Sequence, residues 1–219
     1  DPLWSRGLGD VYKRQLYSGA ATLNVNTTLT TTNSDVTFSG TLNSNNGTAK
    51  TLTIAAGGGT VTMNGAVGGS NVLGATTITA GNFTTGSSGT ITMGANALTI
   101  NTDAITIGAA ISGSSTLTIA PKTASTTIAL GSGATGTLKL DDAELTNLTN
   151  GFSSITFGSS SATGKISLSG FTYSDYIKLY NYGASSGGIE FVGAVSTGTD
   201  NLTLYTTGSV TQASGGSIT

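Results

Sequence analysis

The chain has 219 residues and a net charge of −2; only 8% of its residues are charged, whereas 33 are Gly. This charged fraction lies far below the usual quarter and argues against an ordinary cytoplasmic enzyme, and the absence of Arg after residue 14 argues against a nucleic-acid partner. His and Cys are both absent, which excludes Ser-His triads, imidazole metal sites, thiolate nucleophiles and zinc clusters.

Residues 1–15 differ in composition from everything that follows. They contain the only Trp, Trp4, and both Arg residues, Arg6 and Arg14. The stretch DVYKRQ at 10–15 resembles the translated end of an adapter used in sequencing libraries. We therefore expect 1–15 to be a non-native or unstructured leader, with a native basic leader as the alternative. Residues 16–219 are predicted to form one repeat domain, a fragment of a much larger protein.

A short phrase recurs along this domain: an aliphatic residue, a small or polar residue, and a second aliphatic or aromatic residue. Alternation with period two predicts strands with one buried face, and β-branched Thr on the other face suits an extended backbone. The very short strands predicted in this way are 52–54, 61–63, 91–93, 98–100, 105–107, 117–119, 128–130, 138–140, 155–157, 166–168, 177–179, 189–191 and 202–204.

The spacing of these strands limits the fold. From residue 155 onward they start 11 to 13 residues apart, which is too short for crossover helices. A parallel β-solenoid and an antiparallel β-sandwich or barrel both remain. Most breaks are Gly-Ser or Gly-Ala clusters rather than Asn-Gly turns, which favours the solenoid. We predict an all-β parallel β-helix with about eight or nine coils of about 22 to 25 residues, without end caps.

The solenoid hypothesis also predicts which residues stack. The sets that should share a face are Ile155, Ile177 and Leu202 on one face and Ile166, Ile189 and Val210 on another. In this register Leu179 lies under Leu204, and Tyr180 lies under Tyr205. Open ends would expose unpaired strand edges, so end-to-end association is expected.

Segment 141–150 departs from the strand pattern. Its acidic residues are Asp141, Asp142 and Glu144. We predict a short helical turn capped by Asp141 or Asp142, with Leu145 and Leu148 on its apolar side and Gly151 at its end. The alternative is a calcium site that uses the three carboxylates.

Segment 173–182 is the richest in aromatic residues. If Ile177 and Leu179 point inward, the residues between and beside them point outward. Outward Tyr side chains can stack on sugar rings, whereas the alternative is a ladder of rings that only stabilises coil stacking. The candidate ligand-binding residues are Tyr176, Tyr180, Tyr182 and Tyr205.

Thr repeatedly forms T-x-T pairs at positions predicted to face outward. The pairs are Thr51 and Thr53, Thr60 and Thr62, Thr90 and Thr92, and Thr116 and Thr118. Flat solenoid faces that carry such rows can match ice, so an ice-binding solenoid is an alternative function. The irregular spacing of the pairs argues for the simpler explanation, which is the β-propensity of Thr on a solvated face.

The phrases at 105–120, 142–170 and 202–219 resemble the repeat regions of filamentous-haemagglutinin-like exoproteins. The resemblance implies a right-handed parallel β-helix, exported by two-partner secretion and serving attachment or aggregation. We expect a non-enzymatic structural or adhesive segment that is extracellular or on the bacterial surface, associated with the outer membrane. Its expected partners are surface glycans or proteins, and no cofactor is expected. A polysaccharide-active enzyme is disfavoured because the carboxylates are scattered.

Overall fold

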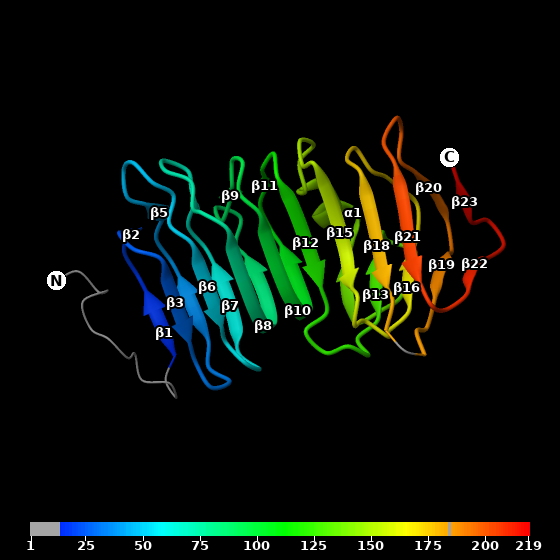
Figure 1. The fold of residues 1–219 in the computed structure, drawn as a ribbon, viewed down its shortest axis with the longest axis horizontal. Coiled ribbons are helices and arrows are strands. Elements are labelled where there is room, and N and C mark those ends of the chain that lie inside the picture. Colours follow the sequence, from blue (N-terminus) through cyan, green and yellow to red (C-terminus); the bar gives the residue numbers. More distant parts are fainter. Residues whose placement is uncertain (1–13, 184) are drawn as a thin grey trace.

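The computed structural model describes residues 14–183 and 185–219. Over these residues the chain winds into a parallel β-solenoid of about nine turns, with one short helix, α1 (Asp142–Thr146). Successive coils follow one another from the blue end to the red end in Figure 1. The predicted solenoid is confirmed. The alternative of an antiparallel sandwich or barrel is wrong, because neighbouring strands pair in parallel.

Three walls, which we call faces A, B and C, enclose the core. Face A carries strands that lie side by side in chain order (Figure 1). They are β3 (Thr27–Thr30), β6 (Leu52–Ala55), the first halves of β8 (Thr76–Thr85) and β10 (Leu98–Ile107), β12 (Thr116–Ala120), β15 (Ser154–Ser159), β18 (Ile177–Asn181) and β21 (Leu202–Thr206).

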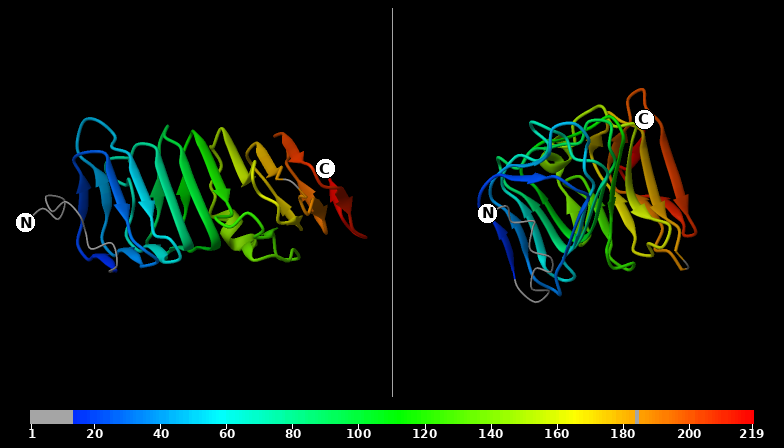
Figure 2. Two further views of the ribbon diagram at one scale, coloured as in Figure 1. Left: turned by 60° about the horizontal axis from the view of Figure 1, so that its bottom comes forward. Right: turned by 60° about the vertical axis from the view of Figure 1, so that its left-hand side comes forward.

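Faces B and C complete each coil (Figure 2). Face B consists of β1 (Gln15–Tyr17), β4 (Val36–Phe38), β7 (Thr60–Met63), the second halves of β8 and β10, β14 (Leu138–Leu140), β13 (Ile128–Leu130), β16 (Ile166–Leu168), β19 (Ile189–Phe191) and β22 (Val210–Gln212). Face C consists of β2 (Ala21–Leu23), β5 (Leu42–Ser44), β9 (Ile91–Thr92), β11 (Ile111–Ser112), β17 (Phe171–Thr172), β20 (Ala194–Ser196) and β23 (Ser217–Ile218), with single bridges at Val67 and Leu148.

The predicted register is confirmed in the carboxyl-terminal coils. The paired sets are Ile155, Ile177 and Leu202 on face A and Ile166, Ile189 and Val210 on face B. Leu179 pairs with Leu204, and Tyr180 pairs with Tyr205. Along face A the inward row stays apolar, and Ile54, Ile100 and Leu179 are fully buried. Each such side chain contributes about 1.5–3 kcal/mol of hydrophobic stabilisation.

Coil length varies more than the sequence predicted. On face A, the stacked residues Leu29, Ile54, Ile78, Ile100 and Ile119 are 25, 24, 22 and 19 residues apart. The next partner, Phe157, follows only after 38 residues, because segment 121–153 adds β14 and α1 to one coil. The chain steps back from β13 to β14, which pairs with β13 and lies against β10. This segment bulges from the regular stack in the left view of Figure 2.

Strand β10 is much longer than predicted, and β8 was not predicted. Strands β8 and β10 are ten residues each, and both pass from face A to face B without losing their pairing partner. The inward and outward alternation shifts by one residue at Gly81 in β8 and at Asp103 in β10, where the ladder skips one pair. Hydrogen bonding therefore continues around this corner, and two predicted strands, 98–100 and 105–107, are one.

Two predicted boundaries need correction. Strand β1 starts at Gln15 and pairs with β4, so the solenoid begins one residue earlier than predicted. Trp4 and Arg6 lie outside the described residues. Helix α1 ends at Thr146 with Asn147 as its C-cap, and Gly151 instead lies in the turn that leads into β15. Asn147 can end the helix because its side-chain amide donates to the carbonyl of Ile107 (2.8 Å), which anchors the last turn to β10.

Candidate functional site

The four candidate tyrosines lie together at the carboxyl-terminal end of face A. Tyr180 on β18 stacks on Tyr205 of β21, with ring centroids 4.2 Å apart and ring planes 18° apart. The Tyr176 hydroxyl is 2.7 Å from the Thr203 hydroxyl. Tyr182 follows β18 and is the most exposed of the four. We call these four residues and Lys178 the tyrosine patch.

Local alternation positions the tyrosine patch. Ile177, Leu179 and Asn181 are fully buried, so the residues between them on β18 face outward. Lys178 places its ammonium 4.8 Å from the centroid of the Tyr176 ring, a cation–π distance. Desolvation, followed by the hydrogen bond and charge of Tyr205, raises the pKa of the Tyr180 hydroxyl. The Tyr180 hydroxyl therefore stays protonated at neutral pH and can donate a hydrogen bond.

The stacking divides the roles of these rings. Tyr180 and Tyr205 cover one another, which is the geometry expected for a ladder that stabilises the coils. Tyr182 is 55% exposed and Tyr205 is 37% exposed. The Tyr182 ring and the uncovered face of the Tyr205 ring therefore remain open to a ligand. The patch can therefore both stabilise the last coils and present aromatic surface.

A second outward row on face A consists of Thr. Strand pairing places its members in one line across six coils; they are Thr28, Thr53, Thr77, Thr99, Thr118 and Thr156. Neighbours in this line are one strand spacing apart, about 4.8 Å. Lys178 and Thr203 occupy the next two positions. We call the six residues the threonine row.

The T-x-T pairs named from the sequence do not form one surface. The pairs at 51/53 and 116/118 lie on face A, but the pair at 60/62 lies on face B and the pair at 90/92 on face C. A T-x-T phrase marks an outward stretch of any strand and does not identify its wall. The threonine row depends on register between coils, which the sequence phrase alone does not specify.

The three candidate carboxylates of segment 141–150 are engaged by backbone groups. Asp141 is the N-cap of α1 and forms a capping box with Glu144: each side chain accepts from the other's backbone N–H, at 2.9 and 3.0 Å. The second oxygen of Glu144 accepts from the Ile107 N–H at 3.0 Å, and Asp142 accepts from the Ser132 N–H at 2.9 Å. Within the described part of the chain, no group of three or more acidic residues is arranged to hold a metal ion.

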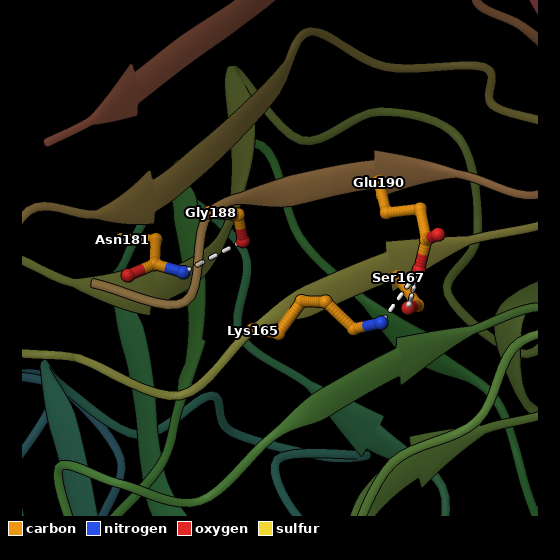
Figure 3. A network of polar contacts seen from close by, with 5 residues as sticks. All are labelled: Lys165, Ser167, Asn181, Gly188 and Glu190. Atoms are coloured by element: carbon orange, nitrogen blue, oxygen red, sulfur yellow. Dashed lines mark hydrogen bonds and ion pairs between the residues drawn. The ribbon is translucent and has the colours of Figure 1, made fainter. Parts of the chain in front are cut away.

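A polar network joins β16 and β19 on face B (Figure 3). The Lys165 ammonium lies 2.6 Å from a Glu190 carboxylate oxygen, and the Ser167 hydroxyl lies 3.5 Å from the same oxygen. The hydrogen bond and then the charge of Lys165 lower the pKa of Glu190. Beside it, the buried Asn181 amide donates to the carbonyl of Gly188 at 2.9 Å (Figure 3). The Lys165–Glu190 contact connects neighbouring coils, and the Asn181 hydrogen bond joins β18 to the residue before β19 in one coil. The network contains no free nucleophile or general base.

Sequence reasoning missed two buried polar residues, Tyr173 and Asp175. They lie between β17 and β18, are 4% and 5% exposed, and line a cavity beside α1. The alternation in Phe171–Asp175 is a weak signal for their inward direction. They line a cavity only because two segments of face C do not pair beside them. The sequence of 171–175 alone does not show that missing pairing.

Comparison with known proteins gave no match to a family model, to a curated protein or to a solved structure. Across the two described ranges, no helix has the length and hydropathy needed to cross a membrane.

Proposed function

We propose that this chain is a non-enzymatic structural and adhesive segment of a large bacterial surface or secreted protein. The observation that supports this most strongly is the stack itself: about nine turns held in register by parallel ladders and a continuous apolar row. Such a stack forms a stiff rod, which can hold a binding surface at a distance from the cell surface. Export by two-partner secretion, location at the cell surface and attachment to surface glycans or proteins belong to the same proposal.

The polar chemistry of the chain supports a structural role. The carboxylates of Glu144, Asp175 and Asp103 accept hydrogen bonds from residues of other coils or strands. Glycosidases need two carboxyl groups held across a sugar-binding cleft. These three carboxylates instead hold coils together, which favours a scaffold over a polysaccharide-active enzyme.

The tyrosine patch is the adhesive surface in this proposal, and a glycan-array and cell-binding assay of the full chain tests it. The test variant replaces Tyr176, Tyr180 and Tyr182 with Ala, and circular dichroism checks that its β structure is intact. Loss of binding in the folded variant supports an adhesive patch. Equal binding by parent and folded variant rejects the patch, and no binding by the folded parent rejects adhesion by this segment and leaves a stalk.

A second candidate function, ice binding, is favoured by one observation, the threonine row. Its six residues are evenly spaced on a parallel sheet, although coil length varies, because the turns absorb the variation. Replacing Thr77 and Thr99 with Tyr should abolish inhibition of ice recrystallisation if this row binds ice. The matched control replaces Thr62 and Thr84, an outward pair on face B. No inhibition by the parent chain rejects this candidate.

A further inference from the structure

The wall of face C is interrupted where α1 enters the solenoid. Leu148 bridges back to Ile111, and β17 pairs forward with β20. Among the described residues, no backbone hydrogen bond joins 148–150 to 171–172. Instead, the Asp175 carboxylate accepts from the Gly151 N–H at 2.9 Å and ties the two coils together at their corner. The extra length of the 38-residue coil thus leaves an opening in an otherwise paired wall.

A cavity of about 330 Å³ occupies this opening. Leu145 and Leu148 line it from the helical side and Phe171 from β17, while Ile155 and Ile177 reach it from face A. The volume lies at the lower end of the range of small-molecule sites, which suits one ring rather than an extended ligand.

Two buried polar groups line the same cavity. Asp175 is 5% exposed and supplies the only charge among the lining residues, while Tyr173 is 4% exposed. The Tyr173 hydroxyl has no hydrogen-bond partner among the described residues. This oxygen has essentially no accessible surface, so the polar group that a ligand in the cavity can reach is Asp175. A carboxylate without a neighbouring cation disfavours anionic ligands, and its desolvation disfavours purely apolar ones.

We propose that this cavity, the α1–β17 pocket, binds one neutral sugar ring of a surface glycan. Asp175 accepts a hydrogen bond from a ring hydroxyl, and Phe171 covers an apolar face of the ring. This assignment rests on the adhesive function proposed above and adds a binding site distinct from the tyrosine patch. It also names the ligand class, because neutral polyols combine hydroxyl donors with apolar C–H faces.

The test uses the full chain and the methyl glycosides of glucose, galactose, mannose and N-acetylglucosamine, with binding followed by saturation-transfer NMR and titration. Ser174 is exposed and lines the pocket, so Ser174→Phe blocks the opening without altering the core. Asp175→Asn keeps an acceptor for Gly151 and removes the charge. We expect at least one glycoside to bind the parent, to lose binding in Ser174→Phe and to bind about tenfold more weakly to Asp175→Asn, a loss of about 1.4 kcal/mol.

The matched control is Ser160→Phe, because Ser160 is exposed and does not line the pocket. It should bind like the parent. The proposal is overturned if no glycoside binds, if Ser174→Phe binds like the parent, or if methylammonium binds in place of every glycoside. Glycan-array binding that persists in Ser174→Phe but disappears in the triple tyrosine variant would overturn the pocket alone and leave the adhesive function standing.

Discussion

The coils before and after the inserted segment 121–153 share one interior and differ outside. Along face A the inward row is apolar in both regions, from Ile54 and Ile100 to Ile177 and Leu179. The outward threonine row runs to Thr156 and continues as Lys178 and Thr203, and in these last coils the tyrosine patch lies beside it. Packing against the neighbouring coils restricts the inward row, whereas solvent allows the outward row to vary. The difference separates residues that build the rod from residues that give each surface its chemistry.

The two regions also join their walls differently. In the amino-terminal coils, β8 and β10 connect faces A and B into one sheet. In the carboxyl-terminal coils the walls form separate sheets, and the last coil leaves Val210 and Ile218 about half exposed. Local opening should therefore start in the carboxyl-terminal coils, since no continuous strand joins their walls in the part of the chain that the structure describes.

The largest expected effect comes from a charge in the inward row. Ile177→Asp should destabilise the fold by more than about 4 kcal/mol, because it buries a charge without a partner between Ile155 and Leu202. Lys178→Ala, one residue away on the outward side, should cost less than about 0.5 kcal/mol. Chemical denaturation measures both, and equal losses would contradict the assigned directions.

A smaller effect is expected at the junction of the two regions. Asp141→Ala removes the capping box of α1 and should cost about 1 kcal/mol. The control is Lys139→Ala on the exposed side of β14. A thermal melt in which both variants match the parent would show that α1 does not support the inserted coil.

The two regions should respond to pH in opposite directions. Burial would raise the pKa of Asp103, but hydrogen bonds from Thr123 and Thr126, with the charge of Lys122, outweigh it and lower this pKa from 3.8. Burial, reinforced by Asp200, raises the pKa of Asp175 from 3.8 despite the N–H groups of Gly151 and Phe152.

A lowered pKa gives stability that is present above pH 3.8 and is lost as the pH falls through the folded value. A raised pKa gives stability that is present below pH 3.8 and is lost as the pH rises through the folded value. Melting temperatures measured across this range should show that Asp103→Asn removes the first dependence and Asp175→Asn the second. If the stability contributions of Asp103 and Asp175 changed with pH in the same direction, the environments assigned to these two carboxyl groups would be wrong.

The smallest effect tests the stacked rings. A double-mutant cycle with Tyr180→Ala and Tyr205→Ala should give a coupling energy of about 0.5 kcal/mol, since the ring pair is partly solvated. The same cycle at Thr77 and Thr99, neighbours in the threonine row, should give less. A larger coupling at the Thr pair would reverse the structural roles given to the two outward rows.

Much of the strand pattern could be predicted because it is local. Every predicted strand overlaps a strand of the structure, although 91–93 does so only at Ile91–Thr92. The prediction did not include β3 and β8, where Thr27 and Thr76 replace one apolar residue, nor β4, although Val36–Phe38 fits the phrase. The capped helix was predictable because Asp141 and Glu144 lie within one turn. The tyrosine patch followed from alternation about Ile177 together with a nearly constant coil length after residue 155.

The sequence by itself determined which residues point inward, because successive side chains of a strand alternate between its two faces. Only the tertiary structure decided that β14 steps back toward β10, that the threonine row falls on one wall, and that face C opens beside Asp175. These features depend on pairing between residues 10 to 38 positions apart. The entropy of closing a loop changes slowly with its length, so coils of very different lengths form with similar ease and the partner is chosen by packing.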